Sequence, residues 1–467
     1  MLFSSITFLY YFLPIVLVIY FAVPKGWKNY VLLISSLFFY FCGEPIYTWL
    51  LVFSSVSDYF HSLYIEKYRG TVKAKIALCS SIIINLGMLG YFKYTDFFIE
   101  NINSVFGTAL PLLKISLPIG ISFFTFQTMS YTIDVYRGRV SAQRNFASLA
   151  TFVCLFPQLV AGPIVRYTDV DKALTARTHS ISAVAYGIKR FALGLGKKVL
   201  IANVMGELCA AFFQSGEGNV LFYWMYAIAY TLQIYFDFSG YSDMAIGLGS
   251  MFGFSFPENF DYPFISKSIS EFWRRWHMTL GGWFRDYLYI PLGGNRVSTI
   301  KWIRNIFIVW FLTGFWHGAQ WNFIIWGLGF GVMLILEKFF IADFLKKLPS
   351  FVSHIYVMLI VIVSFIIFDA RSMPQVMSVL KGMLGVGGVA LAGQQSVYLL
   401  SSYAVTFIMA IVGATPLPKM LVNKLLETGL GEKFGVILEP LFVGLLLLVT
   451  TAYLVDGSFN PFLYFRF

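Results

Sequence analysis

The long apolar stretches of this chain limit its fold more than any other feature. Runs of that kind recur from one end of the sequence to the other. Only helices and closed barrels cross lipid, and these runs are too long and too evenly apolar for barrel strands. Since one spanning helix needs about 20 mostly apolar residues, the sequence predicts an all-α integral membrane protein with about 10–12 transmembrane helices plus re-entrant or interfacial helices.

The composition supports the same class of protein. Hydrophobic residues make up 58% of the chain and charged residues only 12%, whereas a soluble domain is about a quarter charged. Most of the exterior must therefore face lipid. The candidate stretches, several of them short or interrupted, are 5–23, 29–42, 46–65, 75–93, 116–135, 146–164, 183–202, 220–237, 302–326, 327–341, 352–368, 396–414 and 434–454.

The formal net charge of +11 reflects basic residues that fall between the apolar stretches. Lys25 and Lys28 follow the first stretch, and the gaps at 67–75 and 137–144 are also basic. Positive loops stay on the cytoplasmic side, so these gaps are expected inside and the N-terminus outside. Charge of this kind indicates topology and contact with the lipid bilayer, not binding of nucleic acid. With no basic residue before it and Pro14 inside it, the first stretch is expected to stay as a helix.

The four cysteines, Cys42, Cys79, Cys154 and Cys209, stand singly in apolar stretches. They form no CxxC pair and have no Cys/His spacing for zinc. We therefore expect them to pack as small hydrophobic side chains, with no metal site and no thiol intermediate. No long linker or repeat divides the chain, so a single polytopic membrane domain is expected over residues 1–467.

Residues 256–305 differ from the rest of the chain because they are aromatic, basic and rich in glycine. The segment is too charged to span lipid and too aromatic for a free loop, which favours an interfacial or re-entrant helix. Ser268 or Ser270 is expected to cap a helix that runs to about Leu280. Glu271 and Arg275 would then meet one helical turn apart.

His317 lies within an apolar stretch from about Ile306 to Phe330. An ionisable side chain inside a membrane protein generally faces the protein interior or an aqueous cavity. A neutral imidazole there could accept a proton as a general base, and the adjacent glycines would leave room for an acyl chain. The structural alternative is a hydrogen bond between helices, with Gly314 and Gly318 permitting close packing.

Two runs of residues resemble a known family. EFWRRWHMTLGGWFRDYLYIPLGGNR (271–296) and GFWHGAQWNFIIWG (314–327) are similar to the bacterial branch of the membrane-bound O-acyltransferases, and closest to its alginate O-acetylation group. The runs PIGISFFTFQTMSYTIDVYRG (118–138), FPQLVAGPI (156–164) and YFDFSGYSDMAIG (235–247) also resemble this family. The resemblance covers roughly residues 1–340, with the family core at about 100–340.

The resemblance implies a ring of helices around a central tunnel in the bacterial inner membrane. His317 matches the family's catalytic base, and His277 matches a second histidine that forms the tunnel or assists catalysis. The acyl group would come from acetyl-CoA, a substrate rather than a bound cofactor. It would pass to an extracytoplasmic acyltransferase partner of the SGNH type and then to a polysaccharide such as alginate.

Further residues around the two histidines are candidates for the substrate tunnel or for donor binding. They are Trp273, Arg274, Arg275, Trp276, Arg285, Asp286, Trp316, Asn322 and Asp237. The arginines could hold the phosphates of CoA, or pair with neighbouring carboxylates and lipid headgroups. Asp237 and Asp243 could orient a histidine or line the cavity, or stabilise a broken helix. An oxyanion role is considered for Asn322.

Two other functions stay open at this point. The same fold could transfer D-alanine to teichoic acid from a carrier-protein thioester, and no residue separates a carrier protein from CoA as the donor. A transporter or flippase is the alternative from another class. Transporters usually show repeated halves with matching broken helices, whereas the polar interruptions here gather in one central block.

Overall fold

The computed structural model describes residues 1–216, 218–457, 460 and 463, without the side chains of 429–432. Over these ranges the chain is helical and contains no strand. Several of the helices are long and strongly apolar. The predicted all-α membrane protein is therefore confirmed.

Five helices are long and apolar enough to cross a membrane. They are Val72–Phe106, Trp321–Leu345, Ser350–Asp369, Gln394–Gly413 and Lys433–Asp456, and a shorter apolar helix covers Phe8–Ala22. Each overlaps an apolar stretch of the sequence. The remaining apolar helices are shorter or more polar. The larger number of about 10–12 transmembrane helices therefore stays a prediction.

The chain divides into two compact units. The first comprises Met1–Phe191 and Ser242–Glu258, and the second comprises Ala192–Tyr241 and Asn259–Phe467. The helices α10 (Ile181–Gly196) and α12 (Val220–Met251) contribute residues to both. The expectation of a single polytopic membrane domain over residues 1–467 stays a prediction.

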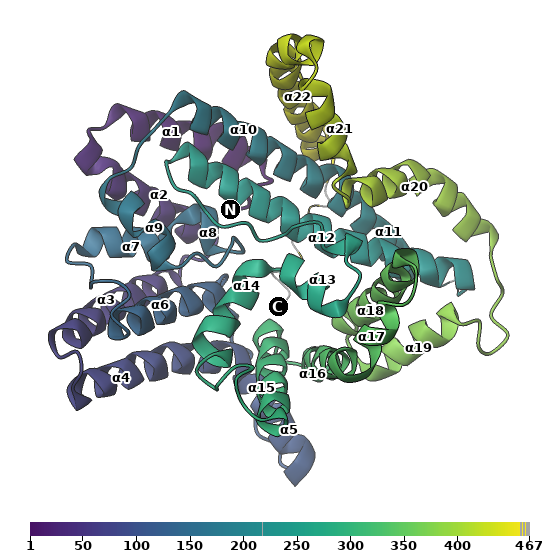
Figure 1. Cartoon of the computed structure of the whole chain (residues 1–467), viewed down its shortest axis with the longest axis horizontal. Coiled ribbons are helices and arrows are strands. Elements are labelled where there is room, and N and C mark those ends of the chain that lie inside the picture. Colours follow the sequence, from purple (N-terminus) through teal and green to yellow (C-terminus); the bar gives the residue numbers. More distant parts are fainter. Residues whose placement is uncertain (217, 458–459, 461–462, 464–467) are drawn as a thin grey trace. The chain divides into compact units, whose positions relative to one another are not determined.

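The first unit is built from helices that pack side by side. In chain order they are α1 (Leu13–Ala22), α2 (Lys28–Phe41), α3 (Thr48–Lys67), α4 (Val72–Leu89), α5 (Thr95–Phe106), α6 (Ile121–Tyr136), α7 (Phe146–Cys154), α8 (Phe156–Leu159) and α9 (Tyr167–Thr175). Figure 1 shows α3, α4 and α6 lying next to one another. The apolar stretch 146–164 is thus not one helix, because Leu155 leaves the helical conformation between α7 and α8.

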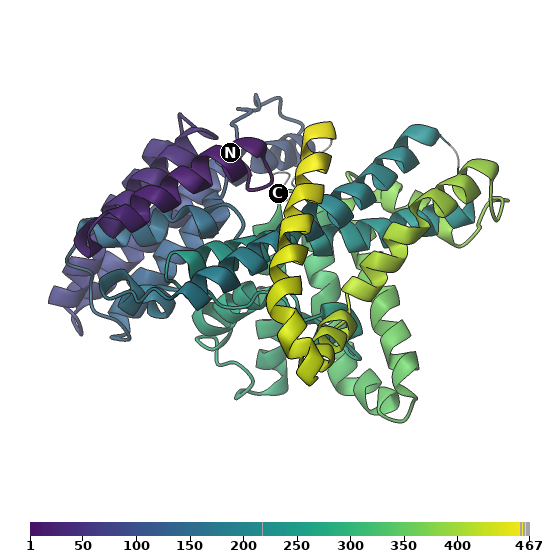
Figure 2. The same ribbon diagram turned by 90° about the horizontal axis from the view of Figure 1, so that it is seen from above.

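The second unit holds the segment that resembles the acyltransferases. Its helices include α11 (Val204–Ser215), α13 (Ile269–Arg275), α14 (Met278–Phe284), α15 (Thr299–His317), α16 (Trp321–Leu336), α17 (Ala342–Leu345), α18 (Ser350–Asp369), α19 (Met373–Met383), α20 (Gln394–Gly413), α21 (Leu417–Leu426) and α22 (Gly429–Asp456). Figure 2 shows α22 as the long yellow helix, which packs against α21.

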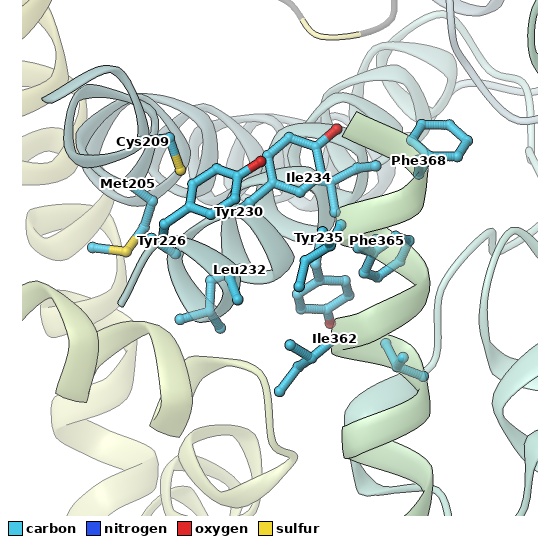
Figure 3. Close-up of a cluster of buried hydrophobic side chains, with 14 of the residues drawn as sticks. Met205, Cys209, Tyr226, Tyr230, Leu232, Ile234, Tyr235, Ile362, Phe365 and Phe368 are labelled. Carbon is cyan, nitrogen blue, oxygen red and sulfur yellow. The ribbon is translucent and has the colours of Figure 1, made fainter. Parts of the chain in front are cut away.

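The core of the second unit is apolar and aromatic. Tyrosines of α12 lie near Phe365 and Phe368 of α18 (Figure 3). Cys209 is buried in the same cluster and Cys154 is buried elsewhere, so the predicted packing is confirmed for these two. Cys42 and Cys79 are exposed.

Helix α12 is longer than the apolar stretch 220–237 predicts. It continues without a break through Asp237 and Asp243 to Met251. Both carboxylates form ion pairs, Asp237 with Lys198 at 2.6 Å and Asp243 with Arg190 at 2.6 Å. Because each charge is compensated, the helix needs no irregular backbone here, and the broken helix considered above is wrong.

Candidate functional site

The segment around His277 consists of two short helices separated by a sharp break. The Ser268 hydroxyl accepts a hydrogen bond from the backbone N–H of Glu271 at 3.0 Å, which confirms a serine cap at the start of α13. Glu271 pairs with Arg275 at 3.0 Å, also as predicted. The helix ends at Arg275, however, and not near Leu280.

His277 causes this early end because its backbone is left-handed, with φ at +46°. Few residues other than glycine adopt that conformation, since the Cβ atom meets the backbone. The surrounding contacts must therefore hold it in place. Asn259 provides them: its carbonyl accepts the N–H of Met278 at 2.9 Å, and its side-chain Oδ1 accepts from Thr279 N at 3.3 Å and Oγ1 at 2.8 Å.

The same amide fixes the proton of the His277 ring. Nδ1 of His277 lies 3.1 Å from Oδ1 of Asn259. The backbone N–H of Thr279 can only donate, so the Asn259 atom that faces it is the acceptor oxygen, and His277 must donate to it from Nδ1. Neutral His277 then carries its lone pair on Nε2.

Burial reinforces this state of the ring. His277 is 2% exposed, and burial lowers its pKa well below the usual range. Among the residues that the structure describes, its Nε2 has no hydrogen-bond partner. The ring is therefore neutral and oriented, with Nε2 as a hydrogen-bond acceptor.

His317 is the last residue of α15, and the chain turns back immediately after it. The extended Gly318 leads to α16, which begins at Trp321. The helix boundary lies at this turn and not at residues 326–327, where the two apolar stretches were divided. The cause is local, since residues 318–320 leave the helical conformation.

Glycines allow the two arms of this hairpin to touch. A Cβ on Gly314 would lie 2.3 Å from the carbonyl oxygen of Phe323, and one on Gly327 would lie 2.3 Å from that of Trp310. A Cβ on Gly318 would meet the Phe323 ring at 2.2 Å. These glycines serve close packing, and the Phe323 ring fills the space beside Gly318 that an acyl chain was expected to use.

Aromatic rings connect the two histidines. The ring of Trp316 lies 6.0 Å from that of His277 and 5.0 Å from that of His317, measured between centroids. His317 also packs edge-to-face against Trp326 at 5.1 Å and Phe368 at 5.3 Å. His317 is 4% exposed, so both imidazoles are buried among aromatic rings.

The aromatic cluster continues away from His317 through Trp273. Its ring lies 5.6 Å from Trp326, 4.7 Å from Trp310 and 4.8 Å from Phe330. The indole N–H groups of Trp273 and Trp326 are buried without a hydrogen-bond partner within the described ranges. Buried polar groups are usually paired, so these donors mark positions where a polar ligand atom would be stabilised. The Trp276 ring stacks on the Phe272 ring, with 5.5 Å between their centroids.

Two of the three candidate arginines form ion pairs with carboxylates. Arg275 pairs with Glu271 and with Asp261 at 2.8 Å, and Arg285 pairs with Asp286 at 2.7 Å. Pairing with carboxylates, one of the two alternatives for them, is therefore observed. Arg274 is exposed.

Two other candidates also have structural partners. Asp237 joins the buried ion pair with Lys198 and accepts the backbone N–H of Leu463 at 2.9 Å. Asn322 donates through Nδ2 to the carbonyls of Phe368 at 3.2 Å and Ala370 at 2.9 Å, at the end of α18. These contacts favour structural roles for both side chains.

The comparison with known families decides the class of this protein. Residues 115–379 match the model of the membrane-bound O-acyltransferase family. The chain belongs to this family. It is therefore an O-acyltransferase, and the interpretation as a transporter is set aside.

Curated relatives of this acyltransferase extend the comparison. A probable alginate O-acetylase of Azotobacter vinelandii is 40% identical over 417 residues, which cover 88% of this chain and 84% of the relative. A peptidoglycan O-acetyltransferase of Helicobacter pylori is 36% identical, with 84% and 81% covered. A teichoic acid D-alanyltransferase of Bacillus subtilis is 33% identical over only 48% of this chain and 59% of the relative.

Asn259 is the site residue of this acyltransferase that the sequence did not reveal. It stands in the run PENFD, which has no recognisable spacing relative to His277. Its importance depends on a contact between residues eighteen positions apart. Over the described ranges, no group of three His, Cys, Asp or Glu side chains is placed to hold a metal ion.

The acyltransferase also has an open pocket of about 680 Å³ beside the first turns of α15. Lys267, Lys338 and Lys346 line it together with Trp302 and Glu337. The ammonium of Lys338 lies 3.6 Å from the centre of the Trp302 ring. At 1.5 Å per helical residue, Trp302 and His317 are roughly 22 Å apart along α15.

Proposed function

We propose that this protein is an acetyltransferase of the bacterial inner membrane that uses cytoplasmic acetyl-CoA for O-acetylation of an extracytoplasmic polysaccharide. The relatives that cover most of the chain are named for acetylation of alginate and of peptidoglycan. Both names describe an acetyl group on the hydroxyl of an envelope glycan. The acceptor of this chain is accordingly alginate or another cell-surface glycan.

The observation that carries the proposal is the pair of buried histidines around Trp316. Acyl transfer to a hydroxyl requires a base that removes the proton as the oxygen attacks. We assign this role to His317, in accordance with its family position, and a supporting role to His277. Because burial keeps His277 neutral and Asn259 fixes its proton on Nδ1, its free Nε2 would accept a hydrogen bond from the hydroxyl.

The proposed reaction balances without a further reactant. The acceptor hydroxyl loses its proton to the imidazole of His317 while its oxygen bonds to the thioester carbonyl carbon. The carbon–sulfur bond then breaks, and the departing CoA thiolate takes the proton from the imidazolium. The indole N–H groups of Trp273 and Trp326 could donate to polar atoms of the substrates in the aromatic cluster.

The lysine-lined pocket supports CoA as the donor. Of its three lysines, Lys346 pairs with Asp343 at 2.7 Å, and the Glu337 carboxylate already accepts the backbone N–H groups of Ile269 at 2.7 Å and Ser270 at 2.9 Å. The positive charges of Lys267 and Lys338 therefore remain available for phosphate groups. A nucleotide held there would direct its long flexible thioester arm along α15 toward His317.

Transfer to the glycan is proposed to need a second protein. The acetyl group would leave the membrane on an extracytoplasmic acyltransferase of the SGNH type, whose hydroxyl is the first acceptor. This partner would recognise the sugar. Its need follows from the family resemblance, and the assay below includes it for that reason.

The test is turnover of radiolabelled acetyl-CoA by the purified full chain in lipid, with and without the partner and glycan. We expect release of free CoA and transfer of label. His317→Ala should lower turnover by a factor of about 10²–10⁴, the usual contribution of a general base, while the protein stays folded. His277→Ala should lower it less.

A matched control is His354→Ala, since His354 lies in the same unit with one 3.3 Å contact to the Ser266 carbonyl. This variant should keep full turnover. If His317→Ala also keeps it, the histidine is not the base. If wild-type protein releases no CoA even with the partner present, the acetyl-CoA proposal fails.

D-alanyl transfer is the second candidate because a teichoic acid D-alanyltransferase also matches. That match covers about half of this chain, whereas the O-acetylases cover most of it. A D-alanyl carrier-protein thioester offered in the same assay separates the two donors directly.

A further inference from the structure

The first unit contains a cluster of four basic side chains. Lys25 lies in the turn after α1, and Lys28 is the first residue of α2. Arg177 and His179 lie in the loop that precedes α10. In the part of the chain that the structure describes, none of the four forms an ion pair with a carboxylate. Like charges repel and partly buried cations are costly, so an uncompensated cluster requires a reason.

The Arg177 guanidinium is held by the Asn29 side chain and lies 5.8 Å from the centre of the Tyr20 ring. Nη2 donates to the side-chain oxygen of Asn29 at 2.7 Å, while Nη1 is buried without a hydrogen-bond partner among the described residues. The guanidinium carbon lies 4.6 Å from the centre of the Phe254 ring. An oriented guanidinium with an unused N–H edge is suited to a phosphate oxygen.

The neighbouring side chains complete a basic recess. The ammonium of Lys28 lies 4.5 Å from the centre of the Tyr20 ring, and the Tyr20 hydroxyl lies 2.8 Å from Nε2 of His179. Burial lowers the pKa of His179, and the charges of Lys28 and Arg177 lower it further. The charges of Lys28 and Arg177 therefore act on His179 electrostatically.

Backbone geometry shows that the loop is built to approach closely. Gly253 follows α12 with φ at +80°, a conformation that favours glycine. A Cβ at this position would lie 3.1 Å from the carbonyl of Thr178 and 3.2 Å from Nε2 of His179. The glycine thus permits the loop that carries Arg177 to pack against the end of α12.

The surroundings indicate that the ligand is a lipid. The cluster stands at the end of the apolar helix Phe8–Ala22, and the rings of Phe21, Trp27 and Tyr30 are exposed beside it. Exposed aromatic residues next to basic ones are typical of the boundary between hydrocarbon and water. By the positive-inside pattern this boundary is the cytoplasmic one, where anionic headgroups concentrate.

We propose that Arg177, Lys28 and His179 form a specific site for the phosphate of an anionic membrane lipid. Arg177 would bind two phosphate oxygens through its free edge, and Lys28 would supply a further positive charge. A lipid with a choline headgroup should bind less well, because its own cation would enter the positive cluster. The bound lipid would join the first two helices to the loop before α10.

The experiment is a native mass-spectrometry titration of the purified full chain with phosphatidylglycerol and, separately, phosphatidylcholine. We expect a preference for phosphatidylglycerol. Arg177→Gln should weaken phosphatidylglycerol binding about tenfold, the usual consequence of losing one charge-assisted contact. Lys28→Gln, which removes a charge but no side-chain hydrogen bond among the described residues, should weaken binding in the same direction.

Lys172→Gln is the matched control, since it removes the charge of an exposed lysine in α9, outside the cluster. It should leave binding unchanged. Equal weakening by all three variants would show nonspecific charge attraction and overturn the proposal, as would full binding by both Arg177→Gln and Lys28→Gln. Displacement of the lipid by added CoA would assign the site to the phosphates of the donor and overturn the lipid.

Discussion

Each unit of this acyltransferase contains a buried polar cluster in apolar surroundings, and the two clusters are satisfied to different degrees. In the first unit, Asp58 accepts from Ser81 at 2.6 Å and from Asn85 at 2.9 Å, and Asn85 accepts in turn from Thr128 at 3.1 Å. In the second unit, Nε2 of His277 and the indole N–H of Trp326 have no partner in the described ranges.

The difference separates a structural cluster from a functional one. Polar groups that satisfy one another hold helices together, and here they join α3, α4 and α6. Polar groups left open at a buried position cost stability and persist where a substrate completes them. Substituting a residue of the first cluster should therefore lower the stability of the fold. Substituting a residue of the second cluster should lower catalytic turnover.

The largest effect on stability is expected for Asp58→Ala. The substitution leaves the hydroxyl of Ser81 and the amide of Asn85 without their acceptor, which should lower the free energy of unfolding by about 3 kcal/mol. Turnover per folded molecule should stay at the wild-type value. Thermal unfolding in detergent measures the first quantity and the acetyl-CoA assay the second.

Asp343→Ala is the control for that comparison, because the Asp343 side chain is 89% exposed and pairs with the exposed Lys346. Its unfolding should match wild type. Loss of turnover in folded Asp58→Ala protein would contradict the division and place the first cluster in the reaction.

A smaller effect, on both quantities, is expected for Gly327→Ala. The added methyl group would lie 2.3 Å from the Trp310 carbonyl and must push α15 away from α16. Overpacking of this kind costs about 2 kcal/mol, and it should also displace His317 at the end of α15. Unfolding temperature and turnover are both expected to fall.

Gly329→Ala provides the matched comparison on the same helix, since no described atom lies within 4 Å of its Cβ position. This variant should unfold at or above the wild-type temperature, because alanine favours a helix more than glycine. Equal behaviour of the two variants would show that the hairpin is not tightly packed around His317.

The sequence predicted features that depend on neighbouring residues. Apolar runs indicated the membrane helices, and the short spacings Ser268–Glu271 and Glu271–Arg275 gave the cap and the ion pair of α13. Features that depend on distant partners were not predictable. The break at His277 requires Asn259, and the continuous α12 requires Lys198 and Arg190 to neutralise its carboxylates.

The most specific test of the histidine cluster is Asn259→Asp, which changes one charge at the ring of His277. A carboxylate can still accept the Thr279 hydrogen bonds, so the fold should be kept. It also favours the imidazolium, and should raise the pKa of His277 by about one to three pH units.

The turnover of this variant should therefore decline as pH falls through the raised pKa, because the protonated ring cannot accept a hydrogen bond at Nε2. Wild type should show this decline only at lower pH, since burial already keeps its ring neutral. Identical pH profiles for the two proteins would mean that His277 takes no part in proton transfer, and that Asn259 serves only to shape the break between α13 and α14.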